Sequence, residues 1–181
     1  NDALATEYVC VLRYYRHYFM ASGMLADAVK GEFLEHAKQE QAHAHRIAER
    51  IVQLGGEPDL DPDTLTARAH AEYKEGKNLR DMVKENLIAE RIAIDSYREL
   101  ILWIGDKDST TRRMLEDILA QEEPCGDLHH GMDPGLDDEA IGTRNRGTFQ
   151  RGIERDAVAA RHRTLQPEAG EAREFLIARQ R

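Results

Sequence analysis

Four segments of the chain repeat apolar residues at helical spacing, and the apolar stripe of each segment holds one glutamate. The segments span roughly residues 3–21, 26–55, 79–104 and 109–123. Their stripe glutamates are Glu7, Glu40, Glu90 and Glu122. Nothing in the sequence has the alternating pattern of a strand. The pattern therefore predicts an all-α protein in which four helices each bury one face.

The connections between these segments differ in length. The GDKDSTTRR stretch is a short turn that offers Asp108 or Ser109 as the N-cap of the last helix. A loop this short makes the third and fourth helices antiparallel neighbours. The connection from Gly55 to about residue 78 begins within the helix-breaking LGGEPDLDPDT stretch. It is long enough to carry the chain to the far side of a bundle.

Buried carboxylates at one depth of a bundle need cations. A carboxylate is rarely buried alone, because its desolvation without a partner costs several kcal/mol. The spacing from Glu7 to Glu40 is 33 positions and from Glu90 to Glu122 is 32, so the chain contains a helix-pair unit twice. A tyrosine also follows the first glutamate of each pair by seven residues, at Tyr14 and Tyr97.

Glu40 begins a Glu-x-x-His motif that ends at His43. Residues at i and i+3 share a helix face, so both side chains can bind one metal ion. Two helix-pair units that face each other would hold two ions about 3.5 to 4 Å apart. We therefore predict that Glu7, Glu40, His43 and Glu90 are metal ligands. We interpret other acidic residues and histidines as surface or packing residues: Glu32, Glu35, Glu49, Glu99, His17, His36 and His45.

Residues 2–123 resemble the ferritin-like superfamily and, within it, bacterioferritin-type proteins. The resemblance is carried by four stretches: LATEYVCVLRYYRHYF, FLEHAKQEQAHAHRIAERIVQLGGEPDL, NLIAERIAIDSYREL and TRRMLEDILAQEE. It implies a left-handed four-helix bundle with one long crossover. It also implies that a di-iron centre binds to Glu7, Glu40, His43, Glu90 and Glu122. Tyr14 and Tyr97 would donate hydrogen bonds to the ligands or serve as one-electron donors.

The resemblance implies ferroxidase chemistry, in which dioxygen or peroxide oxidises two Fe(II) ions and the ferric product is stored inside a hollow homo-oligomer of 12 or 24 subunits. Carboxylate oxygens suit iron on independent grounds. Haem-binding relatives place a methionine directly after the glutamate of the first Glu-x-x-His motif, whereas this chain has Gln41, which argues against haem.

The fourth segment departs from the family pattern at Pro124. Relatives continue the helix as Glu-Glu-x-His, but here Cys125 takes the place of the histidine and follows the proline. A proline inside a helix costs about 3 kcal/mol, so we predict that the helix ends near Glu123. Residues 124–181 contain nine arginines and no lysine, whereas residues 1–123 contain ten arginines and six lysines. We therefore predict a bundle domain over residues 1–123 and a divergent, disordered tail over residues 124–181.

Two hypotheses explain this tail. The residues from Pro124 to Asp127, if encoded as CCA TGC GGA GAC, read as His-Ala-Glu in another frame, which restores the family motif. A shifted reading frame near codon 124 would make the tail out-of-frame sequence. Alternatively, the tail is a genuine extension in which Cys125, His129 or His130 completes the second metal site. A site with a cysteine ligand favours zinc over reversible iron chemistry. Loss of the histidine predicts an impaired second metal site and a less stable bundle.

Two further functions fit the same residues. The bundle is suited to a di-manganese catalase or peroxide-reducing enzyme, since ligands alone do not select the metal. It also suits a non-catalytic binding protein that has lost its second site. The net charge of -9 argues against direct binding of nucleic acid. The two cysteines form no disulfide framework and there is no apolar run of membrane-spanning length, so we expect a cytoplasmic protein.

Overall fold

The structure, a computed structural model, describes residues 1–23 and 26–132, and for Ala28 and residues 124–132 it describes the backbone alone. This part of the chain forms five helices and no strand: α1 (Asp2–Met20), α2 (Ala26–Gln53), α3 (Pro62–Arg68), α4 (Leu79–Ile104) and α5 (Ser109–Met132). The prediction of an all-α fold is therefore confirmed. None of the described helices combines the length and apolar character needed to cross a bilayer.

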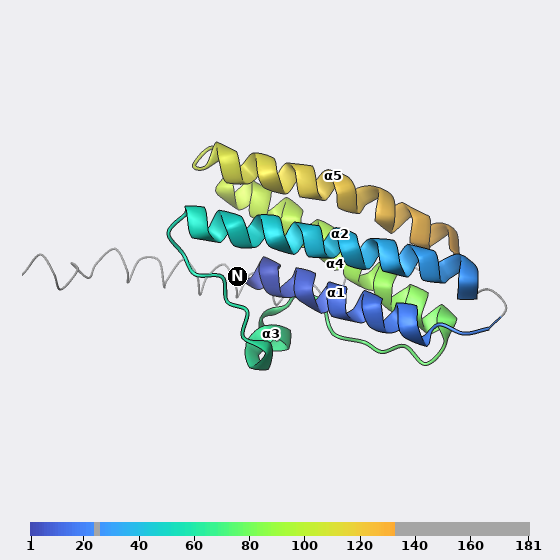
Figure 1. Cartoon of the computed structure of the whole chain (residues 1–181). Coiled ribbons are helices and arrows are strands. Elements are labelled where there is room, and N and C mark those ends of the chain that lie inside the picture. Colours follow the sequence, from blue (N-terminus) through green and yellow to red (C-terminus); the bar gives the residue numbers. More distant parts are fainter. Residues whose placement is uncertain (24–25, 133–181) are drawn as a thin grey trace, which may run out of the picture. The chain divides into compact units, whose positions relative to one another are not determined.

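The four long helices pair as two antiparallel hairpins (Figure 1). α1 packs mainly on α2, and α4 packs mainly on α5. Because α2 and α4 run in the same direction, the connection between them must return the chain along the length of the bundle (Figure 1). Residues 54–78 provide this crossover, and α3 lies within it. The long crossover expected from the sequence is thus present, with a short helix that the sequence pattern did not predict.

Polar side chains define where the helices begin. Asp61 precedes Pro62 and accepts a hydrogen bond from the backbone N–H of Asp63 at 3.0 Å, which starts α3. Asn78 caps α4 by accepting from the N–H of Asp81 at 2.9 Å. α4 ends at Ile104 and is followed by Gly105, whose φ of 52° lies in the left-handed region that favours glycine.

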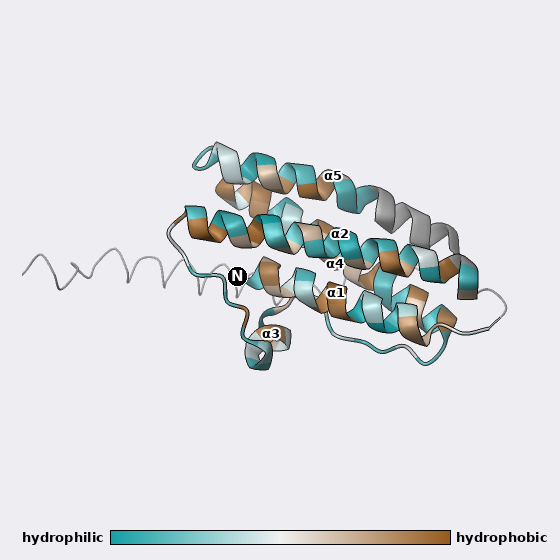
Figure 2. Ribbon diagram, in the orientation of Figure 1, coloured by the Kyte–Doolittle hydropathy of each residue, from teal (hydrophilic) through white to brown (hydrophobic). Residues whose placement is uncertain are grey.

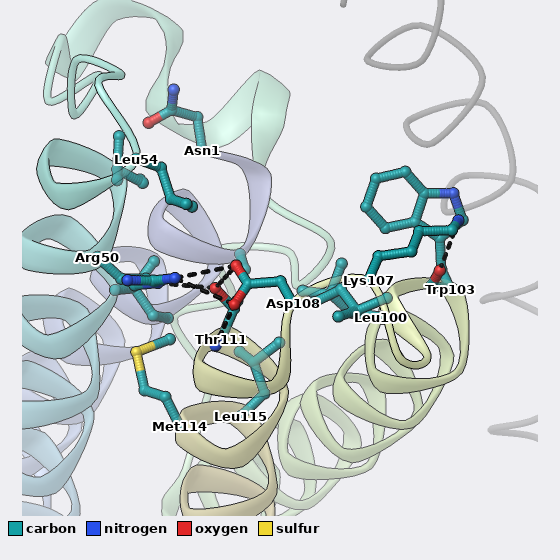
Figure 3. A pocket seen from close by; sticks show the side chains of 14 residues that line it. Asn1, Arg50, Leu54, Leu100, Trp103, Lys107, Asp108, Thr111, Met114 and Leu115 are labelled. Carbon is teal, nitrogen blue, oxygen red and sulfur yellow. Dashed lines mark hydrogen bonds and ion pairs between the residues drawn. The ribbon is translucent and has the colours of Figure 1, made fainter.

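Asp108 caps α5 and ties it to the end of α2. Its Oδ1 accepts from the N–H of Thr111 at 3.0 Å, and its two oxygens accept from Nη2 of Arg50 at 3.1 and 3.0 Å (Figure 3). These bonds hold the pKa of Asp108 below its ordinary value, chiefly through Thr111 and then through Arg50. The side chains border an apolar pocket of about 380 Å³, which also includes Leu54, Trp103 and Met114 (Figure 3). The pocket contains none of the stripe glutamates.

The bundle interior consists of two apolar clusters separated by a polar layer. Each long helix carries hydrophobic and hydrophilic bands (Figure 2). Buried apolar residues of α1, α2 and α4 belong to both clusters, whereas those of α5 belong to one. On α1, Glu7 lies between Leu4 of one cluster and Tyr14 of the other. The polar layer therefore receives apolar packing on both sides. One cluster includes Tyr14, Phe33, Ala37, Val83 and Ala89; the other includes Leu4, Ala44, Ile47, Tyr97, Leu115 and Ile118.

A buried arginine fixes the crossover to the bundle. Arg13 is 1% exposed, and it donates to Oδ1 of Asn86 at 3.1 Å and to the carbonyl of Glu72 at 3.1 Å. His17 lies in the same network, with ring nitrogens 2.9 Å from Oδ1 of Asn86 and 3.1 Å from the carbonyl of Lys74. Burial and then the charge of Arg13 lower the pKa of His17 to about 4, so its ring is neutral near pH 7 and donates from one nitrogen.

The predicted end of the last helix at Glu123 is wrong. α5 continues through Pro124 to Met132. Proline removes one backbone hydrogen bond and crowds the preceding turn, but it does not prevent its neighbours from taking helical dihedral angles. The helix is already anchored by Leu115, Ile118 and Glu122, all at most 2% exposed, before it reaches the proline. The predicted truncation of this helix therefore does not occur.

Replacement of Arg13 tests the crossover network. Arg13→Leu removes the buried donor that bonds Oδ1 of Asn86 and the carbonyl of Glu72, which we expect to lower the free energy of unfolding by about 3 kcal/mol. Denaturant unfolding of the metal-free protein measures this change. Arg16→Leu is the control, because the ion pair of Arg16 with Glu75 is solvent-exposed and should contribute less than about 1 kcal/mol. Equal losses in the two variants would contradict the role of Arg13.

Candidate metal centre

The polar layer between the two apolar clusters contains the five residues that the sequence singled out as ligands. Every long helix contributes to it. Each of these five residues is at most 3% exposed: Glu7 from α1, Glu40 and His43 from α2, Glu90 from α4 and Glu122 from α5. The helical periodicity turns each of these residues inward, and the two hairpins bring them to the same depth. The structure thus brings together all five predicted ligand residues.

Four of the five residues form one tight group in the described part of the chain. Ligand atoms of Glu7, Glu40, His43 and Glu122 all lie within 4.8 Å of one another. His43 is at the middle of this group. Its Nδ1 lies 2.8 Å from Oε1 of Glu122, 3.5 Å from Oε2 of Glu7 and 3.7 Å from Oε2 of Glu40. Glu90 lies beside this group rather than within it.

Gln121 fixes the orientation of the His43 ring. The other ring nitrogen, Nε2, lies 3.3 Å from Oε1 of Gln121, whose own amide donates to the carbonyl of Asp117 at 3.0 Å. Nε2–H therefore donates outward and Nδ1 faces the carboxylates. Histidines that bind metals in proteins are held in this way, with one nitrogen on the metal and the other donating to a neighbouring acceptor. Gln121 carried no signal in the sequence beyond its position next to Glu122.

Two tyrosines support the carboxylates from the apolar clusters. The hydroxyl of Tyr14 donates to Oε1 of Glu90, and the hydroxyl of Tyr97 donates to Oε1 of Glu7. Burial and the neighbouring carboxylates raise the pKa of both tyrosines well above 10, so both remain protonated donors. Each tyrosine reaches the glutamate on the other hairpin. The repeated spacing of seven residues in the sequence thus corresponds to a reciprocal arrangement in space.

The electrostatics of the layer require positive charge. Burial raises the pKa of all four carboxyls, and repulsion from a neighbouring carboxylate raises it further. Oε2 of Glu7, Glu40 and Glu90 is buried and makes no hydrogen bond. Oε1 of Glu122 is also buried, and Nδ1 of His43 lies 2.8 Å from it. Buried polar atoms are usually paired, so this convergent set of oxygen and nitrogen donors fits metal ions.

His43 shows how strongly the carboxylates favour a cation at this point. Burial alone would lower its pKa, but Glu122, Glu40 and Glu7 outweigh burial and raise the pKa from 6.5 to about 12. A proton on Nδ1 therefore adds one positive charge to the acidic group when no metal is bound. A metal ion that takes the Nδ1 position displaces this proton, which couples metal binding to proton release.

His36 also lies in this region, as a packing histidine. It is 6% exposed, and its Nδ1 lies 3.9 Å from Oε1 of Glu90. Its ring stacks on Tyr14, with 5.1 Å between ring centroids and 15° between planes. Burial lowers the pKa of His36. Its position one helical turn before Glu40 was the available signal.

The alternative ligands at the end of the last helix lie outside the described side chains. Cys125, His129 and His130 belong to the part of α5 for which only the backbone is described. Two other histidines were predicted to be surface or packing residues. His17 is buried, and His45 is exposed on α2.

Comparison with known proteins identifies the family. The ferritin-like domain matches residues 1–124. The nutrient stress-induced DNA-binding protein of a Synechococcus species is 30% identical over 138 residues, which cover 74% of this chain and 78% of the relative.

Two solved structures are similar in sequence as well as in fold. The dodecameric, bacterioferritin-related thioferritin of Bacteroides fragilis is 28% identical with a TM-score of 0.66, over 92% of this chain and 88% of that one. A ferritin-like diiron-carboxylate protein of Bacillus anthracis str. Ames is 26% identical with a TM-score of 0.65, over 73% of this chain and 90% of that one. The family match extends over most of the chain, the observed helices form the expected bundle, and the protein belongs to the ferritin-like family.

Proposed function

We propose that this protein is a di-iron ferroxidase that oxidises Fe(II) with dioxygen or peroxide and stores or detoxifies the ferric product. The observation that carries the proposal is the convergence of buried carboxylate oxygens around Nδ1 of His43 at the centre of the bundle. Hard oxygen donors suit Fe(III), and an imidazole retains Fe(II). The similarity to a diiron-carboxylate protein supports iron as the metal.

Two substrate ions at one centre match the chemistry of the oxidant. Each Fe(II) gives one electron, and two electrons convert dioxygen to peroxide or peroxide to water. The residues of the chain prepare the site for this reaction. Gln121 orients His43, the tyrosines orient Glu7 and Glu90, and the apolar clusters on both sides exclude bulk water.

Metal specificity distinguishes the ferroxidase from the manganese alternative. Expression of the protein with iron and with manganese, followed by metal analysis, measures which ion is retained at the centre. Retention of about two iron ions per chain with Fe(II) oxidation supports the proposal. Retention of manganese with peroxide disproportionation would favour a catalase, and the lack of a stoichiometric complex would favour a non-catalytic binding protein.

We propose that the chain acts as a cytoplasmic homo-oligomeric cage. The assembly is supported by the similarity to a thioferritin that is a dodecamer. The cytoplasm is inferred from cysteine usage, since only Cys10 and Cys125 are present. Although a relative is a DNA-binding protein by name, the net charge of -9 opposes direct contact with nucleic acid.

Glu40 provides the most direct test of the proposed reaction. Glu40→Gln removes one carboxylate of the group, so we expect Fe(II) oxidation to slow by a factor on the order of 10 to 100. The same change replaces a buried acid by a neutral side chain of equal size, so the metal-free thermal midpoint should be equal or higher. Ferric absorbance after mixing with dioxygen or peroxide measures the rate. Glu49→Gln, an exposed change on the same helix, is the control.

A parallel loss of oxidation rate and thermal stability in Glu40→Gln would show that Glu40 serves packing. An unchanged oxidation rate would remove Glu40 from the ligand set. The expected result differs from both, because the oxidation rate should fall while the thermal midpoint stays equal or rises.

The tyrosines are predicted to support the ligands rather than to bind metal. Tyr97→Phe removes the donor to Glu7 and should slow oxidation about tenfold while the protein still binds two ions per chain. Rapid-mixing absorbance and equilibrium dialysis measure these two quantities. Tyr15→Phe, a partly buried change on α1, controls for the loss of a hydroxyl. Loss of one bound ion in Tyr97→Phe would instead assign the hydroxyl to the metal.

The metal-free protein should lose stability as the pH rises from about 7 to about 8.5. In this range the unfolded chain has released the proton of His43, whose ordinary pKa is 6.5, while the folded state retains it because the pKa is raised to about 12. The raised carboxyl pKa values have the same sign, since the folded state binds more protons. His17, His36 and His70 have lowered pKa values and oppose this trend only below about pH 6.5.

Denaturant unfolding with a chelator measures this dependence, and His43→Gln should flatten it. Stability that rises over the same range would contradict the assigned protonation of His43.

A further inference from the structure

The two halves of the candidate centre differ in their nitrogen donors. The first half has Glu7 and His43, and Nδ1 of His43 faces the carboxylates. In the second half, the position equivalent to His43 is occupied by Cys125, three residues after Glu122. The second half therefore has the described side chains of Glu90 and Glu122. It has no histidine three residues after Glu122, where the repeat would place one. His36 is close to Glu90, with 3.9 Å between its Nδ1 and Oε1 of the carboxylate.

His36 shares the inward face of α2 with the two ligand residues of that helix. At about 100° per residue, the directions of His36, Glu40 and His43 fall within an arc of about 60°. His36 lies four residues before Glu40 and His43 lies three residues after it. The two imidazoles therefore lie on opposite sides of Glu40 along one helix. All three side chains are buried.

The distance between His36 and Glu90 permits both to bind one ion. Nitrogen and oxygen ligands lie about 2.0 to 2.2 Å from a first-row metal such as zinc, so two donors of the same ion are at most about 4.4 Å apart. Nδ1 of His36 is 3.9 Å from Oε1 of Glu90. That distance exceeds an ordinary hydrogen bond. It is within the range for two ligands of one ion.

Tyr14 holds both groups in this arrangement. Its ring stacks on the imidazole of His36, and its hydroxyl donates to Oε1 of Glu90. The stack restricts rotation of the imidazole, and the hydrogen bond restricts the carboxylate. Oε2 of Glu90 is buried and makes no hydrogen bond, which leaves that oxygen available to a cation. An ordered histidine and carboxylate of this kind need little rearrangement to bind metal.

We propose that His36 supplies the nitrogen ligand of the second metal position, beside Glu90. The inference rests on the proposed function, because it places the second of two ions at the same centre. In this arrangement α2 contributes both imidazoles, one to each ion, with Glu40 between them. The second position then holds metal without a histidine on α5. This differs from the prediction that loss of that histidine impairs the second site.

Cobalt(II) titration of the whole chain under anaerobic conditions tests the assignment. Equilibrium dialysis gives the number of ions bound, and the visible absorption of Co(II) responds to nitrogen ligands. We expect the unaltered protein to bind two ions, and His36→Gln to bind the second ion at least about tenfold more weakly with a changed spectrum. His43→Gln should weaken the other ion. His45→Gln, an exposed change on the same helix, should match the unaltered protein.

The outcomes separate this inference from the proposed function. If the unaltered protein binds no stoichiometric pair of ions, the two-metal function itself fails. If it binds two ions and His36→Gln binds both with unchanged affinity and spectrum, His36 is only a neighbour of Glu90 and the inference is wrong. A thiolate absorption band that disappears in Cys125→Ser, with no effect of His36→Gln, would assign the second position to Cys125. Circular dichroism of each variant checks that the helices are intact.

Discussion

The burial of four carboxylates at one depth of a helical bundle is the constraint on which the structure depends. Glu7, Glu40, Glu90 and Glu122 are each at most 3% exposed, and an uncompensated buried carboxylate costs several kcal/mol. Without a metal ion, the proton of His43, the raised carboxyl pKa values and the tyrosine hydroxyls limit this cost. The apolar clusters above and below the layer stabilise the bundle despite it. A pair of cations would satisfy the same atoms more fully. The carboxylates that would bind metal therefore lower the stability of the metal-free bundle.

The rest of the fold serves to bring the two hairpins together at that layer. A crossover is required because α2 and α4 run in the same direction. Arg13 and His17 attach the crossover to the bundle through Asn86 and two backbone carbonyls. At the end of the bundle, Arg50 and Asp108 connect α2 with the start of α5. These contacts fix the register of one hairpin against the other, which a carboxylate layer needs because its members come from different helices.

The two halves of the centre resemble each other without being equivalent. Tyr14 supports Glu90 and Tyr97 supports Glu7, so the hydrogen bonds follow the repeat in the sequence. The nitrogen donors do not follow it, because His43 has no counterpart at position 125. His36 departs from the repeat and lies on the side that lacks that counterpart. The backbone of α5 passes through Pro124 without ending, so the change at residues 124 and 125 alters side-chain chemistry more than it alters the helix.

The sequence alone determined the four long helices, apart from the end of the last one, their buried faces, and the five acidic and histidine residues that meet between them. Periodicity assigns a residue to a face, and the repeat assigns it to a depth, so local information was sufficient for Glu7 and Glu90. Periodicity does not say which residue of another helix a side chain will meet. The contact of His36 with Glu90, the orientation of His43 by Gln121 and the anchoring of the crossover by Arg13 were decided by the tertiary structure. The continuation of α5 also depended on it, because packing before the proline stabilises a helix that propensity alone would end.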